Sequence, residues 1–240
     1  MEAVELSRFL TAMTLAVHII FATIGVGMPL MFAIAEFLGV KRNDAKYITL
    51  AKRWAKGYAV TVAVGVVTGT IIELQLSLLW PQFMKIAGHV IALPLFMEVF
   101  AFFFEAIFLS IYFYTWERFK NKWTHLIMSI PVVLGGTLSA FFITSVNSFM
   151  NTPEGFQLKN GKMIHVDPVA AMFNSSFGVR AFHVITTAIM TMAFILAAIA
   201  AFKLLKNKFE KDREYHKKAL KLTMIVGLVF TLGSMLAGDL

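Results

Sequence analysis

Six long apolar runs dominate this sequence of 240 residues, and each is about as long as a helix that crosses a lipid bilayer. The hydrocarbon core of a membrane is about 30 Å thick, and a helix spans it with about 20 residues. The runs extend over about Leu6–Leu38, Tyr58–Trp80, Val90–Tyr114, Leu126–Phe149, Phe182–Leu205 and Leu220–Leu240. The sequence therefore predicts an all-α protein, a polytopic membrane bundle of about six transmembrane helices.

The composition excludes an ordinary soluble fold. Hydrophobic residues make up 58% of the chain and charged residues only 15%, whereas soluble domains average about 45–50% apolar and about 25% charged residues. The chain has no cysteine, which excludes disulfides, iron–sulfur clusters and thiolate ligation of haem. Any metal must be held by histidine, methionine or carboxylate side chains.

The basic residues gather in alternate connections between the apolar runs. Segments 41–56, 118–122 and 203–221 hold 17 of the lysine and arginine residues, and the rest of the chain holds 5. Cytoplasmic loops of membrane proteins are enriched in lysine and arginine, so we predict that these segments face the cytoplasm and that the N-terminus lies outside. The net charge of +8 then needs no nucleic-acid partner.

The chain reads as a single membrane domain over residues 1–240, in the cell membrane. We expect a four-helix bundle at about 6–149, an outer loop at 150–178, and helices five and six at about 179–240. Gly65 and Gly69 form a small-xxx-small pair and predict close approach of another helix to the second span.

Several titratable side chains interrupt the apolar runs, and each is a functional-site hypothesis because charge at membrane depth is costly. They are His18, Glu36, Glu73, Glu98, Glu105 and His183. Counted from the outer surface, His18 lies roughly 15–18 Å deep, Glu98 roughly 12 Å and Glu73 about 10 Å. His183 lies near the outer boundary and Glu105 is deeper.

This arrangement suits a cofactor buried between helices, because a haem iron takes one or two axial ligands from a bundle core. The alternative for each histidine is a plain hydrogen bond to a neighbouring helix. Glu98 and Glu105 share roughly one helix face, where they either pair with a cation of another helix or carry protons inward. We interpret Glu36 as solvated at the cytoplasmic end and His125 as interfacial.

Five segments together resemble one known family, subunit I of the cytochrome bd-type quinol oxidases. The first is Glu5-Leu-Ser-Arg-Phe ahead of His18, and the second is Gly65–Gln75 followed by Trp80. The others are Pro94–Glu98 with Ala101–Glu105, Gly136–Ala140 with Asn147–Pro153, and Arg180-Ala-Phe-His183. The resemblance covers the whole chain.

The resemblance implies quinol oxidation outside and reduction of oxygen to water, with a low-spin haem b, a high-spin haem b, and a haem d or second high-spin haem b. It implies that His183 ligates the low-spin haem and His18 one of the high-spin pair. Glu98 matches a carboxylate beside that haem's metal, and Glu105 a proton-path residue. Arg8 and Glu73 lie in matching segments and are expected to bind cofactor.

The chain also departs from the family pattern. Glu98 and Glu105 are seven residues apart instead of eight, which predicts either a shifted Glu98 or a local helix irregularity. The chain stops where the family's quinol-binding loop would begin. We therefore expect a second polypeptide that supplies this loop and the missing methionine and glutamate ligands, and also a subunit II-like membrane partner.

Two other functions stay open at this point. One is a non-catalytic homologue that carries haem for electron transfer or assembly without reducing oxygen. The other is a transporter whose intramembrane carboxylates bind protons or cations, which predicts a colourless protein.

Overall fold

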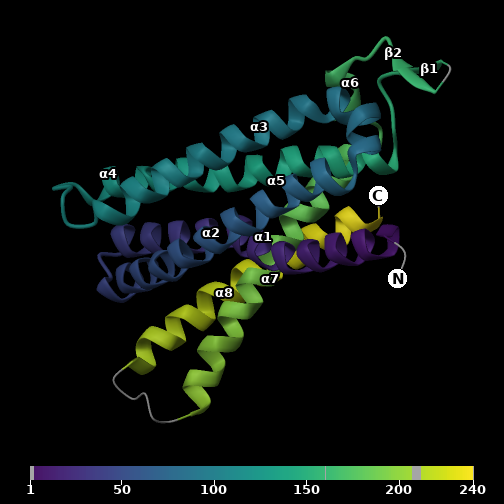
Figure 1. Ribbon diagram of the computed structural model, residues 1–240. Helices are drawn as coiled ribbons and strands as arrows, with labels where there is room; N and C mark the ends of the chain where they lie inside the picture. Colours follow the sequence, from purple (N-terminus) through teal and green to yellow (C-terminus); the bar gives the residue numbers. More distant parts are fainter. Residues whose placement is uncertain (1–2, 160, 207–211, 240) are drawn as a thin grey trace.

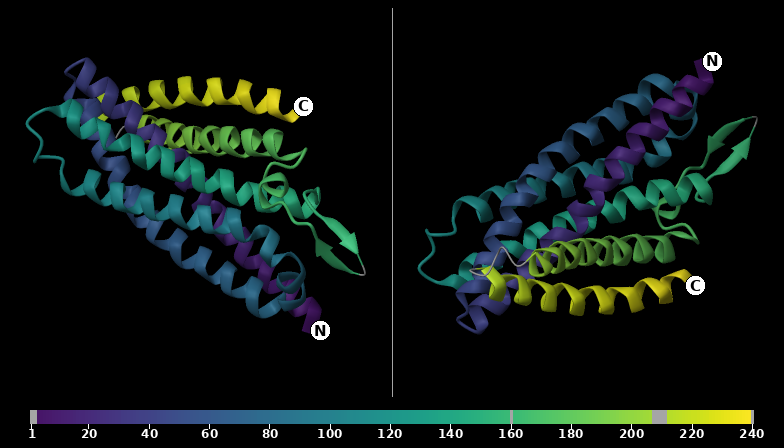
Figure 2. Two further views of the ribbon diagram at one scale, coloured as in Figure 1. Left: turned by 90° about the horizontal axis from the view of Figure 1, so that it is seen from above. Right: turned by 90° about the horizontal axis from the view of Figure 1, so that it is seen from below.

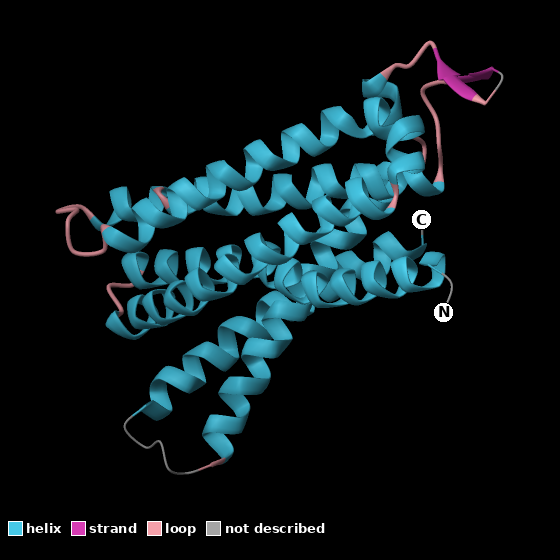
Figure 3. Cartoon of the chain, in the orientation of Figure 1, coloured by secondary structure: helices cyan, strands magenta, loops and turns pink. Residues whose placement is uncertain are grey.

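The computed structural model describes residues 3–159, 161–206 and 212–239, and it consists of long helices and one small β-hairpin (Figures 1 and 3). The long helices are α1 (Ala3–Lys41), α2 (Ala45–Leu79), α3 (Pro81–Tyr114), α5 (Ser129–Asn151), α7 (Phe177–Leu205) and α8 (Arg213–Asp239). Short helices α4 (Lys122–Ile127) and α6 (Pro168–Met172) flank α5. Six described helical segments, with α4 and α5 taken as one, are long and apolar enough to span a membrane. The predicted six-span bundle is confirmed.

The long helices pack mainly as three pairs, α1 with α2, α3 with α5 and α7 with α8. Helix α1 also contacts α5 and α7 and so joins the pairs, whereas α2 and α3 share few contacts although they follow one another. The two chain ends and the β-hairpin lie at one end of the bundle, here called the hairpin end (Figure 2). The α1–α2 turn and α4 lie at the other end, here called the basic end.

The helices extend beyond the apolar runs, most clearly in α2. The expected connection 41–56 is wrong in extent, because only residues 42–44 form the turn. The first turns of α2 are amphipathic, so Leu50 and Trp54 are buried while Lys52 and Arg53 stay exposed. Average hydropathy falls in such a stretch, and that is why the sequence predicted a connection here. Lys208 and Lys211 of the basic count, and Leu240, lie outside the described residues.

The expected outer loop 150–178 contains ordered structure. Strands β1 (Gln157–Lys159) and β2 (Lys162–Ile164) pair antiparallel. The turn between them uses Gly161 with a φ of 71°, a left-handed conformation that glycine adopts without strain. Helix α6 begins after Asp167, whose carboxylate accepts hydrogen bonds from two backbone N–H groups. The all-α class therefore holds for the membrane part, with this hairpin as an addition.

Close contact between α3 and α5 depends on Gly135. A Cβ atom at this position would lie 2.6 Å from Glu105 Cβ and 2.8 Å from Glu105 Cα. We expect Gly135→Ala to lower the free energy of unfolding by about 1–3 kcal/mol, as overpacking does in other cores. Thermal unfolding in detergent, followed by circular dichroism, measures this.

Gly57→Ala in α2 is the matched control, because a Cβ there meets nothing within 4 Å. It should be neutral or stabilise the helix by up to about 1 kcal/mol. Equal melting temperatures for the two variants would contradict the close α3–α5 contact.

Asp44 in the α1–α2 turn ties α8 to α2 through a hydrogen-bonded ion pair with Lys218. The ammonium group of Lys218 holds the pKa of Asp44 below its usual value of 3.8. A carboxyl whose pKa is lowered in the folded state stabilises the protein above its ordinary pKa and loses that contribution as pH falls through the folded value.

We therefore expect Lys218→Ala to cost less than about 1 kcal/mol near neutral pH, as a largely solvated pair does. The difference from wild type should shrink below about pH 4. Melting temperatures at pH 7 and pH 3 test this, with Lys217→Ala as control because its pair with Glu214 is local to α8. A Lys218→Ala deficit that grows on acidification would contradict it.

Candidate functional site

His18 is held in one orientation between α1 and α2. Its Nδ1 lies 2.9 Å from Thr68 Oγ1. The Thr68 oxygen also lies 3.0 Å from Val64 O and 3.1 Å from Gly65 O. In the tautomer in which the Thr68 hydroxyl donates to one of these carbonyls, His18 Nδ1–H donates to the Thr68 oxygen. This leaves a lone pair on Nε2, which makes no hydrogen bond with any described residue.

A glycine makes room for this imidazole. A Cβ on Gly69 would lie 3.2 Å from His18 Cε1, tighter than ordinary contact. The predicted close helix approach at Gly65 and Gly69 is confirmed, with α1 as the partner. A half-buried imidazole with one nitrogen pinned by a second residue and a free Nε2 fits the axial ligand of a haem iron.

The other predicted cofactor ligands lie on open surfaces of the chain. His183 is an exposed residue near the start of α7, and its Cε1 is 4.0 Å from the position of a Cβ on Gly238 of α8. Arg8 and Glu73 are exposed on α1 and α2 and form no ion pair within the described ranges. Nothing in the described chain occupies the His183 ring nitrogens, so this imidazole is also free to ligate.

Glu98 and Glu105 lie two turns apart on α3 and both face α5. Ser139 Oγ donates to Glu98 Oε1 at 2.7 Å. The Tyr58 hydroxyl donates to Glu105 Oε1, and Glu105 lies against Gly135. The shared face is confirmed. Helix α3 runs without a break from residue 81 to 114 but contains Pro94, so the choice between a shifted Glu98 and a local irregularity stays a prediction.

These carboxyl groups are satisfied by hydroxyls and not by cations. Within the part of the chain that the structure describes, neither Glu98 nor Glu105 forms a salt bridge. Glu98 interacts electrostatically with both Glu73 and Glu105. Three acidic groups at membrane depth need a proton or a bound cation to offset their charge, so the geometry suits proton storage.

No group of three or more histidine, aspartate or glutamate side chains among the described residues is arranged to hold a metal ion. His18, His183 and Glu98 therefore stand as separate candidate ligands. Such isolated ligands suit haem, because the porphyrin supplies the other bonds to iron and the protein adds one or two axial ligands.

Comparison with known proteins decides the family. Residues 6–240 match the family model of cytochrome bd terminal oxidase subunit I. The chain belongs to this family. The predicted resemblance is confirmed, and the protein is a multi-pass protein of the cell membrane.

Other subunit I proteins are similar over nearly the whole chain. The putative cytochrome bd menaquinol oxidase subunit I of Bacillus subtilis is 45% identical over 99% of this chain and 54% of its own length. The cytochrome bd ubiquinol oxidase subunit 1 of the same organism is 36% identical over 100% and 51%. The solved bd oxidase of Geobacillus thermodenitrificans is 58% identical over 99% and 54%, with a TM-score of 0.94. The chain spans about half the length of these relatives.

This subunit I chain also holds two buried groups that the sequence reading missed. Glu36 is 2% exposed and His125 is 3% exposed, so the expectations of a solvated Glu36 and an interfacial His125 are wrong. Helix α4 packs against α1 and α5 and places its own His125 on Glu36 of α1. A signal for Glu36 was present, because it follows Met28 and Phe32 at intervals of four residues and so lies on their buried helix face.

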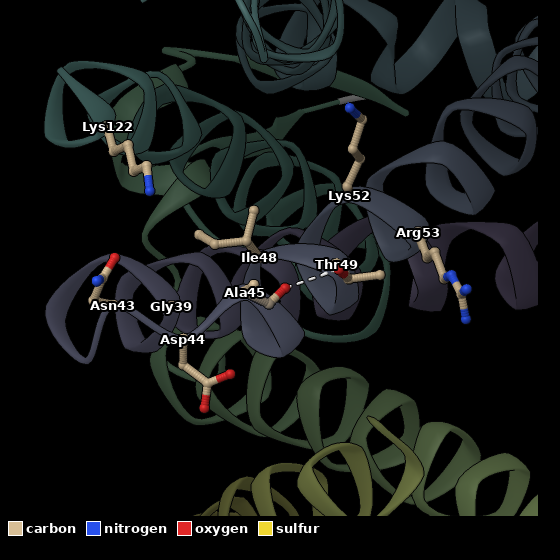
Figure 4. A pocket seen from close by; sticks show the side chains of 9 residues that line it. All are labelled: Gly39, Asn43, Asp44, Ala45, Ile48, Thr49, Lys52, Arg53 and Lys122. Atoms are coloured by element: carbon tan, nitrogen blue, oxygen red, sulfur yellow. Dashed lines mark hydrogen bonds between the residues drawn. The ribbon is translucent and has the colours of Figure 1, made fainter. Parts of the chain in front are cut away.

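A surface cavity of about 470 Å³ opens at the basic end of this chain, around the α1–α2 turn (Figure 4). Its lining includes Asp44, Lys52, Arg53 and Lys122. Lys52 and Arg53 point away from Asp44 and pair instead with Glu117 and with an aspartate that precedes α8. The cavity holds none of the predicted site residues, and its charges are those of a solvated helix turn.

Proposed function

We propose that this chain is a haem-binding part of a bd-type terminal oxidase that transfers electrons from quinol to oxygen. The observation that carries the proposal is His18, whose Nδ1 is engaged by Thr68 at 2.9 Å while Nε2 is free. His18 would hold a high-spin haem and His183 a low-spin haem b. Haem, when bound, supplies the one-electron transfers and the oxygen chemistry. The third haem of the complex would be a haem d or a second high-spin haem b.

The carboxyl groups on α3 then transfer protons to the oxygen-reducing site. Oxygen reduction to water consumes four electrons and four protons, so protons must reach a site inside the membrane. Ser139 donates to Oε1 of Glu98 at 2.7 Å and Tyr58 donates to Oε1 of Glu105, so the second carboxyl oxygen of each glutamate would carry the proton. Together they pass protons outward along α3 from the basic end, which by the distribution of positive charge faces the cytoplasm.

We infer that the remainder of the longer relatives completes the site, on this polypeptide or on a second one. It would supply the methionine and glutamate ligands of the remaining haem positions and the quinol loop, and a subunit II-like protein would cover the bundle. In the halves of α1, α2 and α3 nearest the hairpin end, large apolar side chains are open to lipid or to such a partner. They include Phe9 (56% exposed), Ile20 (59%), Leu78 (74%) and Phe96 (60%).

The deciding experiment is a reduced-minus-oxidised visible spectrum of the purified complex, with haem extraction and quinol-dependent oxygen uptake. Haem bands together with uptake support the proposal. Haem without uptake would instead indicate the non-catalytic homologue. A colourless protein would overturn haem binding and leave the transporter interpretation.

A further inference from the structure

Three helices meet at a buried polar cluster near the basic end. Glu36 of α1 accepts a hydrogen bond from the Tyr112 hydroxyl of α3 at 2.6 Å through Oε2. Its Oε1 lies 2.6 Å from His125 Nδ1 of α4. His125 Nε2 lies 2.9 Å from the backbone oxygen of Tyr112. All three side chains are at most 3% exposed.

The hydrogen bonds fix the number of protons in this cluster. A backbone carbonyl only accepts, so Nε2 of His125 must carry a hydrogen. The contact between His125 Nδ1 and Glu36 Oε1 needs one more proton, which belongs either to the imidazole or to the carboxyl group. The pair is thus neutral overall, and that one proton can move between two atoms 2.6 Å apart.

The cluster continues the row of carboxyl groups along α3. Tyr112 follows Glu105 by seven residues, as Glu105 follows Glu98, and seven residues make about two helical turns or roughly 10 Å. Each carboxyl group in the row has a hydroxyl partner: Ser139 with Glu98, Tyr58 with Glu105, Tyr112 with Glu36.

One apolar ring separates the cluster from the next pair. Phe32 of α1 is fully buried, and its ring centre lies 5.0 Å from that of Tyr112 and 5.8 Å from that of Tyr58. A phenyl ring neither accepts nor donates a proton. A proton that moves from the Tyr112 side of this contact to the Tyr58 side therefore meets the Phe32 ring.

The surroundings of His125 contain few charges. The Tyr112 and Trp116 rings of the same region lie 4.6 and 4.3 Å from its ring centre. The ammonium group of Lys52 on α2 lies 5.9 Å from the centre of the Trp116 ring. Lys52 is exposed and forms an ion pair with Glu117. The pair therefore lies near the basic end and is shielded from bulk solvent.

We propose that Glu36, His125 and Tyr112 form the proton-loading station of the path through Glu105 and Glu98, and that Phe32 is its gate. This rests on the proposed oxidase function. The pair takes up one proton from the basic end, so that carboxyl and imidazole are both protonated. It releases one proton toward Glu105 when Glu105 has lost its own, and no bond other than these O–H and N–H bonds changes.

The competing interpretation is a purely structural clamp between α1, α3 and α4, and Glu36→Gln separates the two. The glutamine oxygen still accepts from Tyr112, and its amide N–H donates to His125 Nδ1, whose Nε2–H stays on the carbonyl. Every hydrogen bond is kept, but the mobile proton is gone. A structural clamp predicts an unchanged rate of oxygen uptake in Glu36→Gln, whereas a proton-loading station predicts a lower rate.

The test uses the complete oxidase complex with its quinol. For Glu36→Gln we expect at least a tenfold lower rate of oxygen uptake, a larger solvent deuterium isotope effect, and unchanged haem spectrum and melting temperature. Glu214→Gln, an exposed α8 residue at the same end, is the control and should match wild type.

Uptake by Glu36→Gln within twofold of wild type, with an unchanged isotope effect, would overturn the proposal. If this variant fails to assemble, Tyr112→Phe decides by the same criteria, because it keeps the ring against Phe32 and removes only the hydroxyl. Wild-type complex without haem or uptake would instead defeat the oxidase function itself, so the two failures are distinguishable.

Discussion

Replacing His18 with alanine should remove one high-spin haem from the complex and abolish oxygen uptake. The His18 imidazole keeps Nε2 without a hydrogen bond to any described residue, and alanine offers no ligand in its place. The loss should appear in the reduced-minus-oxidised spectrum and in the haem-to-protein ratio after extraction. The signal of the low-spin haem that we propose for His183 should remain.

A graded variant and a control make this result specific. Thr68→Val keeps the shape of the side chain but removes the acceptor for His18 Nδ1–H, and loss of such a supporting partner weakens metal binding about 10–100-fold. His89→Ala, an exposed residue of α3, should retain all haem. An unchanged spectrum in His18→Ala would remove the central support for haem binding by this chain.

Replacing Glu105 with glutamine should slow oxygen uptake by about 100-fold, the range in which a positioned proton donor acts, while haem content stays normal. The amide oxygen still accepts from the Tyr58 hydroxyl and still fits against Gly135, so the packing of α3 on α5 is kept. Only the exchangeable carboxyl proton is lost. Uptake rates and visible spectra of the same preparation measure the two effects separately.

Glu214→Gln serves again as control, because it removes a carboxylate outside the proposed path. A Glu105→Gln complex that works at the wild-type rate would show that protons bypass α3. Loss of haem in the same variant would show instead that Glu105 supports the fold, through its contacts with Tyr58 and Gly135.

Several candidate site residues could be predicted from the sequence, because titratable side chains are rare and costly inside a lipid bilayer. A histidine or glutamate within a long apolar run costs free energy and is therefore a functional candidate. His18, Glu98 and Glu105 were predicted on this ground, without knowledge of their neighbours. Helical spacing also placed the two glutamates on one face. Their partners Thr68, Ser139 and Tyr58 were not predicted, because hydroxyl residues are common in membrane helices and only packing selects one of them.

The sequence by itself determined the membrane bundle, its six spans and the main candidate ligands, since length and hydropathy act locally along the chain. Only the tertiary structure decided that α2 begins at Ala45 and that Glu36 and His125 are buried together. Burial of a residue at a helix end depends on which other segment folds over it. Here α4 packs against α1 and α5, so that His125 meets Glu36 and both side chains are buried as one hydrogen-bonded pair.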